Sequence, residues 1–509
     1  MNKLRISKKR SVRLKSNLRF QPLFSGFSMQ IDHLHPLFSA LRLFRKDLPY
    51  IESDVSSFNL WCSEQNHEFK SAFEKLKGLS LNWSNFLVDL EKQDGYCLDS
   101  LYNKLPQEVR GGVELFYTGL NKASYKTNAL LYERNPSKDL HSFIFTNAKT
   151  NPNWKYWWGS GSTDLHIKQS LDHITCTSLT DLILNPSDFD LLYEKISSDI
   201  DRNTLQLITE DDAKGSRIDE SNDDLAFEVR YINHATVVVK KDGYSVMVDP
   251  LLNFYDVENE VSLYDYAPKK IDYVLITHAH YDHIDLSTLI TLRNRIGKIL
   301  LPRASEVETD FNLKKALEPY FPGKVAEIDM FDEIEVGNEF TITPLPFQGE
   351  HADLISPKVT WLVSVTGKNY WFGGDSRAID INLHKFVREK YGSFEAIFIG
   401  TVCQGSSLAR AYPHFANITS ETNSNSRSTA GADHREIFEM INALNPKMVC
   451  IYALGYEKWF RNFLGNPIQS YRDEFDLLRC LVSKQNKNVE KISLLVNPQV
   501  ISYVRSKCQ

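Results

Sequence analysis

Apolar residues in the first part of the chain recur mainly with the spacing of a helix. Apolar positions three or four residues apart predict helices over residues 63–90, 113–131 and 189–200. An acid-rich stretch, ITEDDAKGSRIDESNDDLA, follows at residues 208–226 and has few apolar residues to bury. We therefore predict an N-terminal domain over residues 29–207, followed by an acidic linker over 208–226.

Beyond this linker the pattern changes to short runs of β-branched and aromatic residues, which are typical of strands. The first runs are FEVRYI, ATVVVK, YSVMVD and DYVLIT, at residues 227–232, 235–240, 244–249 and 272–277. KKDG between the second and third runs predicts a tight turn and so a hairpin. Helices are predicted from about Leu286, Glu306 and His434, with further strands between them. Interleaved strands and helices predict a layered α/β domain over residues 227–509.

Composition and charge restrict the classes of function. Hydrophobic residues make up 42% and aromatic residues 12% of the chain, which favours a folded protein. A formal net charge of -6 over 509 residues argues against a general nucleic-acid binder. No run approaches the roughly 18 uncharged apolar residues that cross a bilayer, so we expect no membrane span. The seven cysteines are scattered and form no C-x-x-C pair, which favours a reducing, cytoplasmic location.

The beginning of the chain, MNKLRISKKRSVRLKSNLRF, is basic and has no acidic residue. It lacks the apolar region of a secretory signal, which leaves a basic arm, a transit-like peptide or a disordered leader as alternatives. We predict that residues 1–28 are a disordered leader, with Met29 as an alternative initiator.

The segment THAHYDH, residues 277–283, concentrates potential metal ligands at the end of a predicted strand. His278 and His280 are two apart on an extended segment, so their side chains can point to the same side and share a metal. Asp282 and His283 follow on the bend and can serve a second metal. Imidazole suits zinc or iron, and added carboxylates shift the preference towards harder ions.

THAHYDH resembles the H-x-H-x-D-H motif of the metallo-β-lactamase superfamily, and the resemblance covers residues 226–509. It implies an αββα sandwich, preceded here by a separate mixed α/β domain. YINHATVVVKKDGYSVMVDPLL is similar to the superfamily's opening strands, where Asp249 would brace the metal loop from behind the ligands. WFGGDSR supplies Asp375, which matches the carboxylate that bridges two metals in that family.

Two positions bear on the choice between a hydrolase and another enzyme. The superfamily's hydrolases place a histidine between the first motif and Asp375, where this chain has QGEH. Either Glu350 or His351 could be the ligand, because adjacent residues face opposite ways. Tyr452, at the end of PKMVCIYALG, stands where the last hydrolase histidine is expected. Replacing imidazole by carboxylate favours iron and leaves positions open for dioxygen.

This combination resembles the metallo-β-lactamase-fold diiron β-hydroxylases of nonribosomal peptide biosynthesis, which carry a glutamate in place of the hydrolase histidine. The resemblance favours Glu350 as the ligand and gives Glu350 and Asp375 the central places at the reacting metals. It implies two iron ions, with His278, His280 and Glu350 on one and Asp282 and His283 on the other. Asp375 would lie on or between them.

The implied reaction consumes O2 and electrons from an external donor. It hydroxylates the β-carbon of an aminoacyl group that is tethered by phosphopantetheine to a carrier domain of a nonribosomal peptide synthetase. The resemblance also implies a homodimer, with the N-terminal domain contributing to dimerisation and covering the active site.

Alternatives remain at the levels of residue and function. His234 could be a donor behind the metal ligands or a structural histidine, and His434 could replace the missing late ligand or belong to a helix cap. A dinuclear zinc hydrolase of the phosphodiesterase or lactonase type, with His351 as ligand, is the second enzyme candidate. The third is a non-catalytic module that binds a carrier protein.

Overall fold

The structure is a computed structural model of the chain. It describes residues 10–15, 18–24, 82–83, 85–93, 97–128, 141–147, 165–169, 171–211, 225–252, 255–256, 261–278, 282–303, 313–349, 358–401, 406–407, 428–429, 431–454, 468–486 and 488–505.

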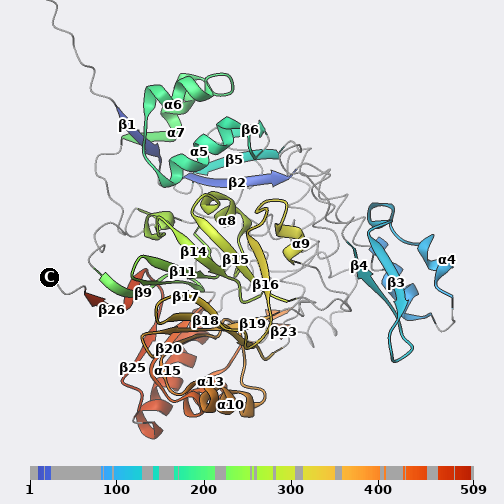
Figure 1. Cartoon of the computed structure of the whole chain (residues 1–509), viewed down its shortest axis with the longest axis vertical. Coiled ribbons are helices and arrows are strands. Elements are labelled where there is room, and N and C mark those ends of the chain that lie inside the picture. Colours follow the sequence, from blue (N-terminus) through green and yellow to red (C-terminus); the bar gives the residue numbers. More distant parts are fainter. Residues whose placement is uncertain are drawn as a thin grey trace, which may run out of the picture.

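Two seven-stranded sheets lie face to face in the C-terminal part of the chain (Figure 1). The first sheet has the order β16 (Val325–Ile328), β15 (Ile296–Pro302), β14 (Ile271–Leu275), β11 (Tyr244–Val248), β10 (Thr236–Lys241), β9 (Leu225–Asn233) and β26 (Gln499–Arg505). The second has the order β17 (Ile334–Gly337), β18 (Phe340–Pro346), β19 (Val359–Val365), β20 (Lys368–Phe372), β21 (Phe394–Gly400), β24 (Pro446–Tyr452) and β25 (Lys491–Leu494).

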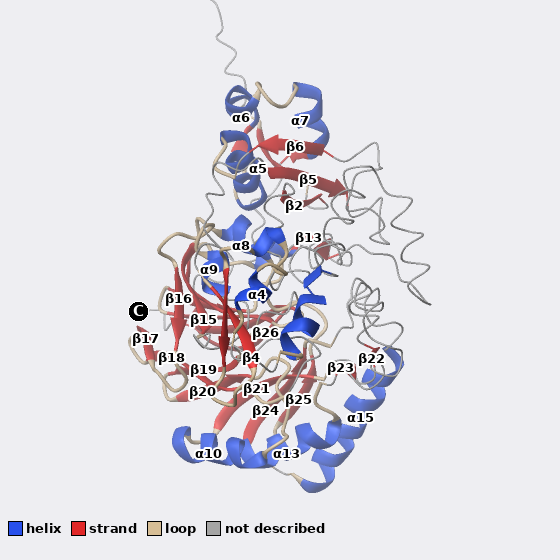
Figure 2. Ribbon diagram, turned by 90° about the vertical axis from the view of Figure 1, so that its right-hand side faces the viewer, coloured by secondary structure: helices blue, strands red, loops and turns tan. Residues whose placement is uncertain are grey.

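Helices flank the pair of sheets. Figure 2 shows α10 (Ile381–Tyr391), α13 (His434–Leu444) and α15 (Ile468–Gln485) along the outer face of the second sheet, and α8 (Leu286–Leu292) and α9 (Leu313–Leu317) beside the first. The predicted αββα sandwich is therefore confirmed. So are the helices predicted from Leu286 and His434, whereas Glu306 lies outside the described residues.

Strand β19 shows how the layers are held together. Trp361 and Val363 point into the apolar core between the sheets, whereas Leu362, between them in sequence, packs into the helical layer. A strand covered on both faces reads as a continuous apolar run, as VTWLVSV does. Truncating a buried aliphatic side chain such as Leu362 to alanine costs about 2–5 kcal/mol.

The predicted hairpin is formed by β10 and β11, with Val239 opposite Val246. Asp242 and Gly243 in its turn have φ of 49° and 83°. Both values lie in the left-handed region that a two-residue turn of this kind requires, and Asp-Gly adopts it readily. This hairpin opens the sheet that carries the site described below.

Residues 11–14 form strand β1 (Ser11–Leu14), so the prediction of a disordered leader was wrong for this segment. β1 pairs with β7 (Ser187–Asp188) and with β8 (Thr209–Asp211), which includes the first residues of the predicted acidic linker. Two basic residues of the predicted leader form ion pairs, since Arg10 contacts Asp211 at 2.6 Å and Arg13 contacts Glu210 at 3.2 Å. Val12 is fully buried in the apolar cluster that also fills the sandwich.

Three helices pack in the same N-terminal region: α5 (Ile174–Leu184), α6 (Phe189–Ile196) and α7 (Arg202–Ile208). α6 confirms the helix predicted over 189–200. Buried side chains of these helices, such as Leu179 and Ile196, share one continuous cluster with the sandwich core. The division of the chain at residues 208–226 remains a prediction.

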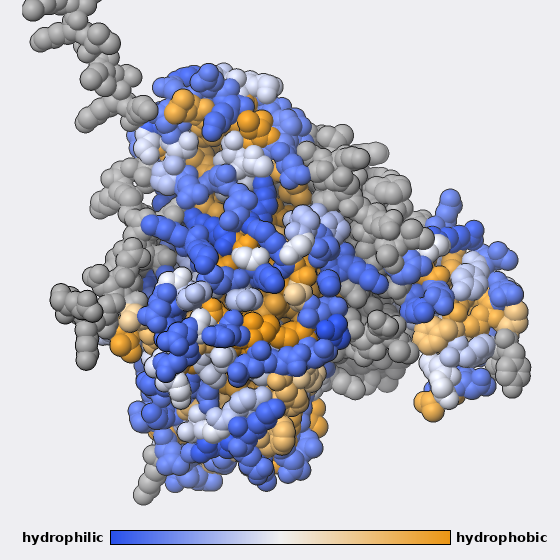
Figure 3. Space-filling view, viewed as in Figure 1, coloured by the Kyte–Doolittle hydropathy of each residue, from blue (hydrophilic) through white to orange (hydrophobic). Residues whose placement is uncertain are grey.

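The helix predicted over residues 113–131 was wrong, because β3 (Val113–Tyr117) and β4 (Ala123–Thr127) form a hairpin there. In β3 the buried Val113 and Leu115 flank the exposed Glu114, which is the alternation of a strand. Figure 3 shows apolar residues on the surface of this part of the molecule, where Leu120 at the hairpin turn is 84% exposed.

Short elements complete the described chain: β2 (Leu18–Phe24), α4 (Asp99–Tyr102), η2 (Gln107–Val109), β5 (His141–Asn147), β6 (Leu165–Gln169), β12 (Tyr255–Asp256), β13 (Val261–Ser262), η5 (Leu263–Tyr266), β22 (Ser406–Ser407) and β23 (Ser428–Thr429). Among the described residues there is no helix with the length and apolar character needed to cross a membrane.

Candidate metal centre

The site begins where the parallel strands β11 and β14 end side by side. Asp249 follows β11, and its N–H donates to the carbonyl of Leu275 at 2.9 Å. Its carboxylate accepts the N–H of Thr277 at 2.8 Å and the hydroxyl of Thr277 at 2.7 Å. Asp249 is fully buried, and these hydrogen bonds fix Thr277, the first residue of the THAHYDH segment.

The same hydroxyl determines which nitrogen of His278 carries a proton. Thr277 Oγ1 lies 2.9 Å from Nδ1 of His278 and already donates its hydrogen to Asp249. It must therefore accept from His278 Nδ1–H, which leaves the lone pair of this imidazole on Nε2. A metal would be bound through Nε2.

His283 is oriented in the same way by Asp249. Its Nδ1 lies 2.7 Å from Oδ2 of that carboxylate, and neither side chain is exposed. An imidazole that donates one N–H to a carboxylate presents the other nitrogen as a basic ligand, and this is the usual arrangement behind protein metal sites. His283 Nε2 is buried and has no hydrogen-bond partner among the described residues.

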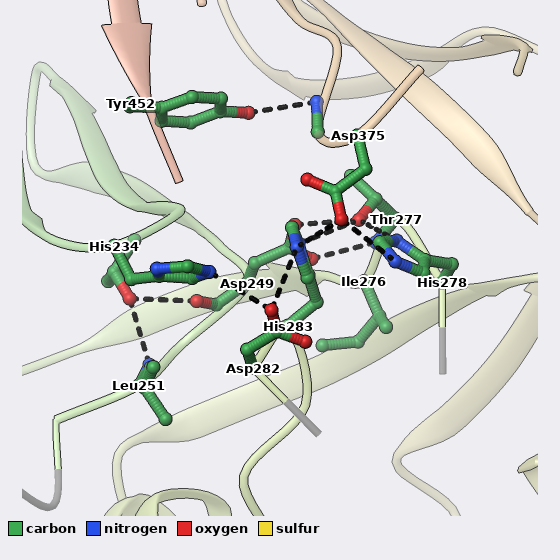
Figure 4. A network of polar contacts seen from close by, with 12 residues as sticks. His234, Asp249, Leu251, Ile276, Thr277, His278, Asp282, His283, Asp375 and Tyr452 are labelled. Atoms are coloured by element: carbon green, nitrogen blue, oxygen red, sulfur yellow. Dashed lines mark hydrogen bonds and ion pairs between the residues drawn. The ribbon is translucent and has the colours of Figure 1, made fainter. Parts of the chain in front are cut away.

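Asp375 approaches these histidines from the other sheet (Figure 4). It follows β20 after a Gly373–Gly374 turn, and its Oδ2 lies 3.8 Å from His278 Nε2 and 3.4 Å from His283 Nε2. A Cβ at Gly400 of β21 would lie 2.9 Å from Asp375 Oδ1, so glycine there makes room for the carboxylate.

A second group of potential ligands shares His283. Oδ2 of Asp282 lies 4.0 Å from His283 Nε2 and 3.2 Å from His234 Nε2. His234 is fully buried in the turn between β9 and β10, with φ of 47°. The ligand atoms of His234, Asp282 and His283 lie within 4.8 Å of one another, as do those of His278, His283 and Asp375.

The electrostatics suit a cation. Burial alone would lower the pKa of His283, but the nearby carboxylates of Asp375, Asp249 and Asp282 outweigh it and raise this pKa well above its usual value. The site therefore favours positive charge at this imidazole. Nε2 of His283 is buried without a hydrogen bond to any described residue, and the nitrogen and oxygen atoms of the site fit a metal ion that takes mixed imidazole and carboxylate ligands.

Tyr452 ends β24 at the place where the sequence suggested a missing histidine. Its hydroxyl accepts the N–H of Gly374 at 3.0 Å. Burial raises the pKa of Tyr452 well above its ordinary value, so the phenol stays neutral. His434 is engaged elsewhere: its Nδ1 lies 2.6 Å from Glu474.

Predicted ligands His280, Glu350 and His351 lie outside the described residues. The two residues before Glu350 are anchored beside Asp375. The carbonyl of Gln348 accepts the N–H of Arg377 at 2.8 Å, and its N–H donates to the hydroxyl of Ser376 at 3.0 Å. Gly349 has φ of 117°, and a Cβ there would meet the side chain of Arg377 at 3.3 Å.

Arg377, which no sequence motif pointed to, is part of this arrangement. Its guanidinium makes two contacts with Glu436 of α13, Nη2 to Oε1 at 2.6 Å and Nε to Oε2 at 3.1 Å. The partners are 59 residues apart in the chain, and no local pattern links them.

Comparison with known proteins connects these features. Residues 244–445 match the sequence model of the Beta-lactamase superfamily domain. The chain is 28% identical over 400 residues to the 4-amino-L-phenylalanyl-[CmlP-peptidyl-carrier-protein] 3-hydroxylase of Streptomyces venezuelae, covering 73% of this chain and 72% of that protein.

Among solved structures, the chain is similar to CmlA, a diiron β-hydroxylase from Streptomyces venezuelae. The TM-score is 0.73 at 21% sequence identity, over 97% of this chain and all of that one. A metal-dependent hydrolase of Exiguobacterium is 40% identical, but over only 62 residues, 12% of this chain and 26% of that protein. The fold likeness to CmlA thus covers 97% of the chain, whereas the likeness to this hydrolase is confined to 62 residues.

Proposed function

We propose that this chain, whose residues 244–445 match the Beta-lactamase superfamily domain, is a non-heme diiron oxygenase that hydroxylates the β-carbon of a carrier-bound aminoacyl group. The single observation that carries the proposal is the likeness to a carrier-protein-dependent 3-hydroxylase over 73% of the chain. The geometry of the buried histidines and carboxylates supports it.

The described candidate ligands would hold two metals, and Asp375 would be available to both. Following the family resemblance, His278 would bind one iron and His283 with Asp282 the other. Oδ2 of Asp375 lies 3.8 Å from Nε2 of His278 and 3.4 Å from Nε2 of His283. His280 and Glu350 would complete the first set. Two iron ions so bound would supply reductive activation of O2 for insertion of one oxygen atom into a C–H bond.

The protein's own contribution is to hold and shield this centre. Asp249 keeps Nδ1 of His283 protonated, and Thr277 does the same for His278, so that both Nε2 atoms remain available as ligands. His234 would hold Asp282 from behind, as a donor at 3.2 Å. All these side chains are buried, which excludes bulk water.

Glu350 is proposed as the carboxylate ligand because the backbone that leads to it is anchored beside Asp375. Gln348 and Gly349 both contact Arg377, two residues after Asp375. Comparing Glu350→Ala with His351→Ala tests the choice, since only loss of the true ligand should lower the iron content.

A zinc hydrolase is less supported. Its last histidine is replaced by Tyr452, whose hydroxyl is occupied by the backbone of Gly374. A carrier-binding module without catalysis would need no buried ligand cluster, yet two overlapping groups are present.

The partners follow from the proposed reaction: a carrier domain bearing an aminoacyl-phosphopantetheine, and an external electron donor. A homodimer and a cytoplasmic location remain predictions from the sequence.

The proposal is tested by reducing the purified protein under anaerobic conditions and exposing it to O2 with candidate aminoacyl-carrier proteins. Intact-mass analysis should show the carrier gaining one oxygen atom, and metal analysis should show iron near two per chain. Zinc in place of iron, with hydrolysis and no gain of oxygen, would establish the hydrolase instead.

A further inference from the structure

We propose that Tyr452 is a positioning residue for Asp375. It stands at the place where a hydrolase of this fold has a metal ligand. The inference rests on the proposed diiron centre and adds to it a role for a residue that does not touch the metals. Its evidence lies in how the Gly373–Gly374 turn before Asp375 is held.

The turn is held on three sides. Gly373 N–H donates to the carbonyl of Phe398 at 2.8 Å, and the carbonyl of Gly374 accepts the N–H of Gly400 at 2.8 Å. Gly374 has φ of 55°, and a Cβ on it would lie 3.3 Å from Thr277 Oγ1. These contacts fix the turn against β21 and against the end of the first sheet.

The remaining polar group of Gly374 is its N–H, which donates to the hydroxyl of Tyr452 at 3.0 Å. This contact joins a backbone group directly before Asp375 to a side chain from β24, 78 residues away. A buried N–H that loses its acceptor is unfavourable, and the turn would avoid this state by shifting. A shift there moves the Asp375 carboxylate.

Tyr452 is itself unable to move freely. It is fully buried, and its ring lies 5.8 Å from that of Phe398, centroid to centroid. The next residue, Ala453, has φ of 48° and donates its N–H to the carbonyl of His234 at 3.1 Å. The end of β24 thus contacts the turn before Asp375 on one side and the histidine that holds Asp282 on the other.

The end of β24 therefore helps to position two carboxylates, those of Asp375 and Asp282, which come from different sheets. If Tyr452 only filled space in the core, it would need no hydrogen bond to the turn, and phenylalanine would fill that space equally well. The hydroxyl is the part of the side chain that carries the proposed role.

Tyr452→Phe tests the role, with Tyr370→Phe as the matched control. Tyr370 is another fully buried tyrosine of the second sheet, in β20. Each protein is loaded with ferrous iron under anaerobic conditions, and iron affinity and the Mössbauer spectrum are measured. We expect Tyr452→Phe to bind iron about 10–100-fold more weakly, with an altered spectrum, and Tyr370→Phe to match the wild type.

The outcomes separate this inference from the proposed function. A wild-type chain that does not retain iron would refute the diiron proposal and the inference with it. A wild type that retains iron, beside a Tyr452→Phe variant with the same affinity and spectrum, would overturn the role of Tyr452 alone. Should the phenylalanine variant not fold, Tyr452→Met removes the same acceptor with a more adaptable side chain and takes its place.

Discussion

The carboxylate of Asp249 and the imidazole of His283 form a 2.7 Å hydrogen bond in a place where neither side chain reaches solvent. The bond fixes the ring so that Nε2 faces Asp375. A residue that is not itself a ligand thus fixes the orientation of a candidate ligand.

Asp249→Asn should weaken iron binding about 10–100-fold without removing a ligand. The amide can present N–H where the carboxylate accepted one, so it no longer enforces the tautomer that exposes Nε2. Iron per chain after equilibrium dialysis measures the effect. Asp272→Asn is the control, because Asp272 accepts the N–H of Ser245 away from the cluster. Equal iron retention in the two variants would argue against the proposed role of Asp249.

Gly400→Ala should lower iron content although Gly400 provides no ligand. The new methyl group would lie 2.9 Å from Asp375 Oδ1 and 3.0 Å from the carbonyl of Gly374, so the turn and its carboxylate must move. Overpacking of this kind costs about 1–3 kcal/mol. Gly119→Ala, where a Cβ meets nothing within 4 Å, should leave both iron content and stability unchanged. An unaltered Gly400→Ala variant would show that Asp375 tolerates displacement.

Arg377 and Glu436 should contribute more to stability than a surface ion pair. Their two-point contact is partly buried, and lysine cannot reproduce it. We expect Arg377→Lys to lower the free energy of unfolding by about 1–2 kcal/mol and to reduce hydroxylation, because Gly349 packs against this side chain.

A double-mutant cycle with Glu436→Gln measures the coupling by denaturant unfolding. The exposed pair Arg303–Asp329 is the reference, with an expected contribution below about 1 kcal/mol. Coupling no larger than that of the reference pair would refute the prediction.

His384 should make the protein less stable in mild acid. It is buried on α10 against Trp371, and burial lowers its pKa from the usual 6.5 to about 4, partly opposed by Asp380. The unfolded chain binds the proton more readily, so stability is lost as the pH falls from about 6.5 to about 4. The shift corresponds to at most about 3 kcal/mol. In urea melts at pH 7 and pH 5, His384→Asn should lose less stability than the wild type, and equal losses would contradict the assignment.

Much of the sandwich was predictable because the signals were local. Strand-length apolar runs predicted β9, β10, β11 and β14, and the KKDG turn predicted the hairpin of β10 and β11. The segment from Val113 was misassigned because its apolar residues fit both helical spacing and alternation over a short window. The turn at Thr118, whose carbonyl accepts the N–H of Asn121, separates the two strands.

The clustering of three candidate ligands was predictable, but some of the contacts that support them were not. His278, His283 and Asp375 were expected to meet, and they do. The contact of Tyr452 with Gly374 and that of Arg377 with Glu436 join residues 78 and 59 positions apart, so they depend on the packing of the second sheet. A sequence lists such residues but gives no sign of their pairing.

The location of Asp375 on one sheet and of His278 and His283 on the other has a mechanical consequence. Iron ions bound by these histidines and by Asp375 would link the two sheets of the sandwich. The folded state would then gain stability in proportion to the logarithm of free iron concentration. A cell short of iron would hold a form of this protein that is idle and also easier to unfold, and so more exposed to proteolysis.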